Sequence, residues 1–126
     1  MPENPDPKHQ FKIDLSYLKD VSSGSNEFMV EMIEIFLDQT PGYFALLDQA
    51  IKDENWTKVA EIAHKIKPTL AFMGADSAKE SMAEIESKAR TGTDLGSVAP
   101  AFNLLYSFSD ELFERLRQAR QELMES

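Results

Sequence analysis

Residues 55–75 of the chain read NWTKVAEIAHKIKPTLAFMGA, and the fold can be inferred outward from this stretch. Its apolar residues recur every three or four positions, as they do on one face of an α-helix. That face consists of Val59, Ile62, Ile66, Leu70 and Met73. Asn is a common N-terminal cap and Gly commonly follows a helix C-terminus. We therefore expect a helix that begins at Trp56, after Asn55, and ends at Gly74.

Helical spacing continues on both sides of this stretch. It predicts a short helix near residues 13–22, a helix capped by Ser25 or Asn26 that stops at Thr40-Pro41, and a restart from Pro41. Further on, it predicts a helix capped by Asp76, a loop over 91–96 and one last helix from Pro100. No alternating strand pattern occurs. We expect an all-α fold, an antiparallel four-helix bundle core with an additional short N-terminal helix.

The domain organisation follows from length and from the proline-rich start. The 126 residues are the usual size of one domain, and three of the six prolines fall within the first ten residues. We expect a flexible lead-in over residues 1–10, which contains His9, and a single helical domain over residues 11–126. The start resembles no signal peptide and no segment is apolar enough to span a membrane, so we expect a cytoplasmic protein.

The charge and the residue types exclude several classes of function. With 13 Lys and Arg against 22 Asp and Glu, the net charge is −9, which argues against nucleic acid and against anionic membranes as partners. The absence of cysteine excludes disulfides, thiolate zinc sites, iron–sulfur clusters and cysteine nucleophiles. Few residues capable of catalysis remain.

His64 is the residue most able to carry chemistry. Together with Glu61 it has the Glu-x-x-His spacing of di-iron bundles, but such sites need a second copy of this motif. At about 100° per residue, His64 points away from the apolar face, so it is not an inward metal ligand. A carboxylate-rich metal bundle is therefore the weakest alternative. A lone exposed histidine is most often a solvated residue, so a non-catalytic helical adaptor stays open as an alternative function.

The residues on the His64 face are mostly small or polar. They are Thr57, Ala60, Glu61, Lys67, Pro68 and Ala71. Such a surface would let a second protein approach the imidazole closely, with the cation of Lys67 one turn away.

Residues 63–75, AHKIKPTLAFMGA, resemble the signature of histidine-containing phosphotransfer (Hpt) domains. In that resemblance, His64 matches the phospho-accepting histidine, Lys67 matches the lysine beside the phosphoryl group, and Gly74 matches the helix-ending glycine. The likeness extends to residues 13–18, to residues 32–37 with Thr40-Pro41, and to Asn55-Trp56.

One position departs from the family pattern. Where the family usually has Gly four residues after the histidine, this chain has Pro68. Proline has no amide hydrogen to donate to the carbonyl of His64, and a kink there would re-aim the imidazole.

The resemblance implies a phosphorelay intermediate without autokinase activity. His64 would accept a phosphoryl group from an aspartyl phosphate on a receiver domain and pass it to another receiver, with Lys67 offsetting its charge. The implied partners are response-regulator receiver domains and a hybrid histidine kinase, and the chain would act as a monomer. It would need no cofactor of its own, because Mg²⁺ would come with the receiver. The implied docking residues are Thr57, Ala60, Glu61, Lys65, Pro68 and Ala71.

Overall fold

The structure, a computed structural model, describes residues 13–126, all of whose regular elements are helical. The helices are α1 (Ser16–Val21), α2 (Asn26–Lys52), α3 (Trp56–Phe72), α4 (Asp76–Thr91), the short 3₁₀ helix η2 (Leu95–Ser97), α5 (Val98–Ser107) and α6 (Ser109–Glu125). The prediction of an all-α fold is confirmed. The predicted lead-in over residues 1–10, with His9, lies outside the described residues. None of the described helices combines the length and apolarity needed to cross a membrane.

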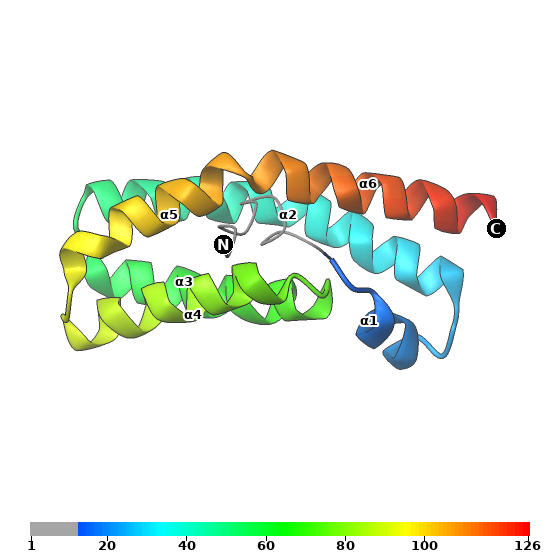
Figure 1. The fold of residues 1–126 in the computed structure, drawn as a ribbon, viewed down its shortest axis with the longest axis horizontal. Helices are drawn as coiled ribbons and strands as arrows, with labels where there is room; N and C mark the ends of the chain where they lie inside the picture. Colours follow the sequence, from blue (N-terminus) through cyan, green and yellow to red (C-terminus); the bar gives the residue numbers. More distant parts are fainter. Residues whose placement is uncertain (1–12) are drawn as a thin grey trace, which may run out of the picture.

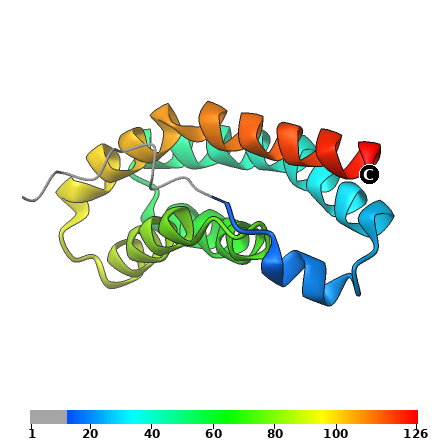
Figure 2. The ribbon, with the colours of Figure 1, turned by 45° about the vertical axis from the view of Figure 1, so that its right-hand side comes forward.

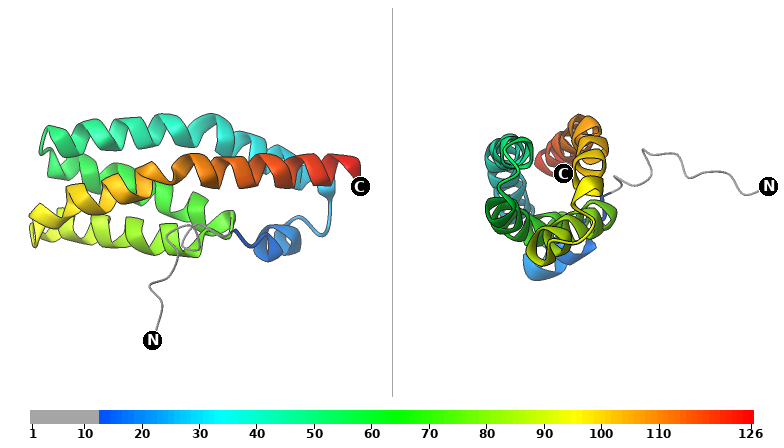
Figure 3. Two further views of the ribbon diagram at one scale, coloured as in Figure 1. Left: turned by 45° about the horizontal axis from the view of Figure 1, so that its top comes forward. Right: turned by 90° about the vertical axis from the view of Figure 1, so that its left-hand side faces the viewer.

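Helices α2 to α6 form the rods of the bundle (Figure 1). α2, α3 and α4 run antiparallel in turn, and α5 and α6 follow one another as the fourth rod, with α6 packed along α2. The end-on view of Figure 3 shows the rods grouped around a shared centre. The short α1 lies beyond the turn between α3 and α4 (Figure 2). The antiparallel bundle with a short N-terminal helix was therefore predicted correctly.

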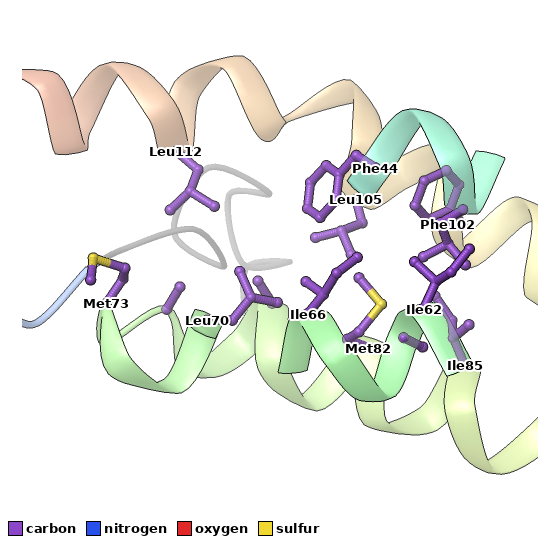
Figure 4. Packing of buried hydrophobic residues seen from close by; sticks show 14 of the residues in the cluster. Phe44, Ile62, Ile66, Leu70, Met73, Met82, Ile85, Phe102, Leu105 and Leu112 are labelled. Carbon is purple, nitrogen blue, oxygen red and sulfur yellow. The ribbon is translucent and has the colours of Figure 1, made fainter. Parts of the chain in front are cut away.

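The apolar face of α3 faces the centre of the bundle. Its five predicted residues are all buried: Val59, Ile62, Ile66, Leu70 and Met73. They meet Phe44 of α2, Met82 of α4 and Phe102 of α5 in one continuous core (Figure 4). Each fully buried large apolar side chain contributes about 1.5–3 kcal/mol relative to exposure, so this face fixes the rotation of α3 about its axis. The opposite face of α3 is thereby turned outward.

The prediction that a helix stops at Thr40-Pro41 is wrong. α2 continues through Pro41 as one helix of 27 residues. Proline removes one backbone hydrogen bond, but Phe36 and Phe44, on either side of it, are buried on a single face with Thr40 between them. Packing along this face outweighs the one lost hydrogen bond.

The prediction of one last helix is also wrong, because α5 ends at Ser107 and α6 begins at Ser109. The serine hydroxyls on both sides of Phe108 donate hydrogen bonds to backbone carbonyls three residues earlier. Ser107 binds the Leu104 carbonyl at 2.7 Å and Ser109 binds the Tyr106 carbonyl at 2.7 Å. Between these two bonds lies Phe108, whose φ of −102° and ψ of 1° depart from helical values and separate the two helices.

The turn between α3 and α4 depends on Gly74. Its φ of 69° is left-handed, and its carbonyl accepts a hydrogen bond from the Asp14 amide at 3.2 Å. A Cβ at this position would overlap the backbone of Asp14. The cap predicted at Asp76 is not formed: the N-cap of α4 is Ala75, without a side-chain hydrogen bond, and Asp76 lies in the first turn. There its charge still favours the helix N-terminus.

Candidate functional site

His64 lies midway along α3 on the face turned away from the core. Its side chain is 65 % exposed, and its Nδ1 atom lies 2.9 Å from Oε2 of Glu86 on α4. The rotation of α3 that buries Ile62 and Ile66 therefore brings His64 to the α3–α4 edge of the bundle. One ring nitrogen is engaged with the protein there, and the imidazole remains open to solvent.

Glu86 joins three nitrogen-bearing side chains in one cluster. The carboxylate is buried, with 7 % of the residue exposed. Lys67 Nζ donates to Oε1 at 2.8 Å, while Arg90 donates to Oε2 from Nε at 3.0 Å and from Nη2 at 2.9 Å. His64 shares Oε2 with Arg90. The carboxylate thus holds the imidazole and both cations at one edge of the bundle.

The charge of Glu86 determines the tautomer of His64. Burial raises the pKa of the Glu86 carboxyl, but hydrogen bonds from Lys67, Arg90 and His64, with the charge of Lys67, lower it to about 2. Glu86 is therefore anionic at neutral pH and can only accept hydrogen bonds. The hydrogen of a neutral His64 ring must then lie on Nδ1, which leaves a lone pair on the exposed Nε2. This is the arrangement of a nucleophilic imidazole.

Glu86 and Arg90 were not predicted from the sequence. Glu86 lies four residues after Met82 and three before Ala89, both of which belong to the buried face of α4. A carboxylate is costly to bury without a partner. The position of Glu86 within an apolar stripe could therefore have predicted a buried carboxylate that has cationic or hydrogen-bonding partners. Arg90, four residues after Glu86, had the spacing of a helical ion pair.

Most of the predicted docking residues lie at the surface. Thr57, Glu61, Lys65 and Pro68 are exposed and Ala71 is half-buried. The inclusion of Ala60 in this surface is wrong, because only 3 % of it is exposed. Ala60 lies two turns before Lys67 on the same side of α3, the side from which Lys67 binds Glu86 on α4, so the open surface around His64 is displaced away from α4.

The two lysines that follow His64 point to different neighbours. Lys67 turns toward α4 and binds Glu86, whereas Lys65 Nζ lies over the ring of Tyr43 on α2, 5.8 Å from its centroid. Of these two cations, only Lys67 shares a partner with the imidazole.

Pro68 does not break α3, which continues to Phe72. The Pro68 ring is exposed and forms one edge of a groove of about 170 Å³ between α2 and α3. The groove is mostly apolar, and its other lining residues include Ile35, Tyr43 and Phe72. An apolar surface therefore begins one helical turn from His64.

Metal ligands do not gather at this site. Within residues 13–126, no three or more His, Cys, Asp or Glu side chains lie together in a way that could hold a metal ion. Glu86, the carboxylate nearest His64, already has Lys67 and Arg90 as partners.

Comparison with known proteins identifies the family. The family model described as "Hpt domain" matches residues 31–119, well over half of the chain. Neither a curated protein nor a solved structure matches significantly. The matched region contains α3 and α4 complete, and with them every member of the Glu86 cluster. The chain belongs to the Hpt domain family.

Proposed function

We propose that this chain is a phosphorelay intermediate in which His64 accepts a phosphoryl group from the aspartyl phosphate of a receiver domain and passes it to another receiver. Hpt domains act in phosphorelays by histidine phosphotransfer and interact with receiver domains. The observation that carries the assignment of His64 is the hydrogen bond of its Nδ1 atom to the Glu86 carboxylate, 2.9 Å long, in a side chain that is 65 % exposed.

This geometry suits nucleophilic attack on phosphorus. With its proton on Nδ1 and its side chain 65 % exposed, His64 has an unprotonated Nε2, so no general base is needed to remove a proton from that nitrogen. As the Nε2–P bond forms, the P–O bond to the receiver aspartate breaks, and its electron pair stays on the aspartate carboxylate. Passing the group onward reverses these steps. His64 can thus take part in both transfers without a base of its own.

Lys67 supplies positive charge beside the acceptor. A transferred phosphoryl group carries about −1.5 to −2 charge near neutral pH. The Lys67 ammonium lies on the same carboxylate as the imidazole, with a third of its side chain exposed, and can reach toward an arriving anion. Catalysis of phosphoryl transfer is mostly positioning and electrostatics, and Lys67 contributes to both. Mg²⁺ belongs to the receiver in this scheme, and the chain has no autokinase activity.

The receiver docks on the exposed surface around His64, formed by Thr57, Glu61, Lys65, Pro68 and Ala71. The apolar groove between α2 and α3 continues this surface away from α4. Burial of apolar area there would hold the receiver while its aspartate faces Nε2.

Phosphotransfer from a labelled receiver tests the proposal. Receiver domains phosphorylated with a radioactive phosphoryl group are mixed with the chain in the presence of Mg²⁺, and label on the chain is followed by gel electrophoresis. We expect rapid transfer to a bond that is labile in acid and stable in alkali, as a phosphohistidine is.

The matched control is His64→Gln. His64 is exposed, so the variant should keep the helical circular dichroism spectrum of the wild type but take up no label. Labelling of the variant at the wild-type level would overturn the assignment of His64. Absence of labelling from every receiver tried would leave the helical adaptor as the better explanation.

A further inference from the structure

The partner of His64 Nδ1 is a charged carboxylate, although a neutral acceptor would be enough to orient the ring. A glutamine at position 86 could accept from Nδ1 through its oxygen or, after a flip, donate to Nδ1 through its nitrogen. A carboxylate with a pKa of about 2 can only accept. The two side chains therefore differ in whether they tolerate an Nδ1 atom that has lost its hydrogen.

This difference matters once the phosphoryl group is on Nε2. Attack by a neutral ring that carries hydrogen on Nδ1 yields a phosphorylated ring with one positive charge. If that ring keeps its Nδ1 proton, the group that later leaves phosphorus is a neutral imidazole. If the proton is lost to solvent, the leaving group is an imidazolate anion, which departs far more slowly.

We propose that Glu86 is a positioning residue that retains the Nδ1 proton of phosphorylated His64 and so keeps the phosphoryl group labile at neutral and mildly alkaline pH. This rests on the proposed role of His64 as phospho-acceptor. The contact that carries it is the 2.9 Å hydrogen bond between Nδ1 and Oε2, whose acceptor is buried. Charge-assisted hydrogen bonds of this length are about twice as strong as neutral ones.

The charged groups around Glu86 leave its negative charge available to the ring. From α3 it meets His64 and Lys67, and from its own helix it meets Arg90. Lys67 occupies the other oxygen, Oε1, and Arg90 shares Oε2 from a half-exposed position. The other helix packed along α4, α5, has no charged residue. Lys67 and Arg90 oppose a cationic ring, but the phosphoryl group and Glu86 together carry more negative charge than these two cations carry positive.

The test is the pH dependence of phosphohistidine hydrolysis. Wild type and Glu86→Gln are phosphorylated by the receiver that labels His64, separated from it, and the loss of label is followed from pH 5 to pH 10. The rate should fall as the Nδ1 proton is lost, and the midpoint of that fall is the quantity compared. Because the His64 ring is 65 % exposed and water screens part of the interaction, we expect the wild-type midpoint to lie about one pH unit above that of the variant.

Two controls distinguish retention of the Nδ1 proton by Glu86 from a general effect of net charge and from an effect that does not require the folded chain. Glu84→Gln removes the same charge from an exposed position on α4, and its midpoint should match the wild type. In urea-unfolded phosphoproteins the wild-type and Glu86→Gln profiles should coincide, because the contact exists only in the folded chain. Nitrogen NMR of the labelled imidazole should report the proton on Nδ1 over the same pH range.

Failure of the proposed function and failure of the proposed role of Glu86 would give different results. If His64 takes up no label, the proposed function fails and this inference fails with it. If His64 is labelled but Glu86→Gln has the wild-type midpoint, His64 remains the acceptor and the role of Glu86 is refuted. An equal shift in Glu84→Gln would also refute it, since net charge would then be the cause.

Discussion

Replacing Glu86 by Gln should destabilise the fold at neutral pH and have progressively less effect in acid. The carboxylate accepts hydrogen bonds from His64 and Arg90 on one oxygen and from Lys67 on the other. An amide of the same shape has one acceptor oxygen, and its NH₂ group would face donors. The variant therefore loses part of the cluster without leaving a cavity.

The magnitude follows from the pKa of Glu86. Burial raises this pKa, but the hydrogen bonds from Lys67, Arg90 and His64 outweigh burial, and the pKa falls from 4.5 to about 2. One pKa unit corresponds to about 1.4 kcal/mol, so linkage gives an upper limit of about 3 kcal/mol at neutral pH. Because the Arg90 and His64 side chains are more than half exposed and so screened by water, we expect about 1–2 kcal/mol. A lowered folded pKa stabilises above pH 4.5, and this contribution is lost as pH falls toward 2.

Urea denaturation, followed by circular dichroism at a series of pH values from 7 to 2, measures this contribution. The difference in free energy of unfolding between wild type and Glu86→Gln should be constant above about pH 5 and shrink below it. Glu84→Gln, on the same helix but exposed, should differ little from wild type at any pH. A difference that stays constant down to pH 2, or that is absent at pH 7, would refute the reasoning.

The remaining predictions concern the acceptor face and the turn after α3. Lys67→Ala should slow transfer about tenfold or more and also lower the free energy of unfolding by about 1 kcal/mol, because Oε1 of the buried Glu86 carboxylate loses its Lys67 donor; an unchanged transfer rate would remove Lys67 from the site. Pro68→Gly should raise the transfer rate, because α3 is continuous and Glu86 orients His64, so a closer approach of the receiver to the imidazole outweighs the loss of the proline ring from the edge of the groove. A lower rate would mean that Pro68 positions His64. Measured by urea denaturation, Gly74→Ala should lower the free energy of unfolding several times more than the matched Gly92→Ala, for which we expect a loss of about 1 kcal/mol. Both glycines have left-handed φ, but only at Gly74 would the added Cβ overlap another segment, so equal losses would show that Asp14 moves aside.

Local signals in the sequence predicted α3 well. The apolar spacing gave its buried face, Asn55 accepts a hydrogen bond from the Lys58 amide at 3.2 Å as a cap does, and Gly74 has the expected left-handed φ. Each of these properties depends on residues within a few positions of one another. The exposure of His64 followed from the same periodicity, because burying one face of a helix necessarily exposes the other.

Tertiary packing accounts for the errors. The chain passes through Pro41 as a helix because buried residues on both sides share one face, and Ala60 is buried because α4 covers one flank of α3. A helical wheel treats a helix as though it had a single partner. α3 contacts both α2 and α4, so its exposed face is narrower than its polar face.

The position of Glu86 explains why the sequence identified the acceptor His64 but not the residues that contact it. His64 was visible within a local motif, whereas Glu86 lies 22 residues later and reaches His64 only when α4 packs against α3. A buried carboxylate is tolerated because Lys67, Arg90 and His64 satisfy it, and those contacts also fix the hydrogen on Nδ1 and the lone pair on Nε2. The contacts that hold this edge of the bundle together are thus the contacts that prepare the nucleophile. A substitution at Glu86 should therefore change stability and phosphotransfer together, whereas one at exposed His64 should change phosphotransfer with a smaller loss of stability, because Arg90 still donates to Oε2 of Glu86.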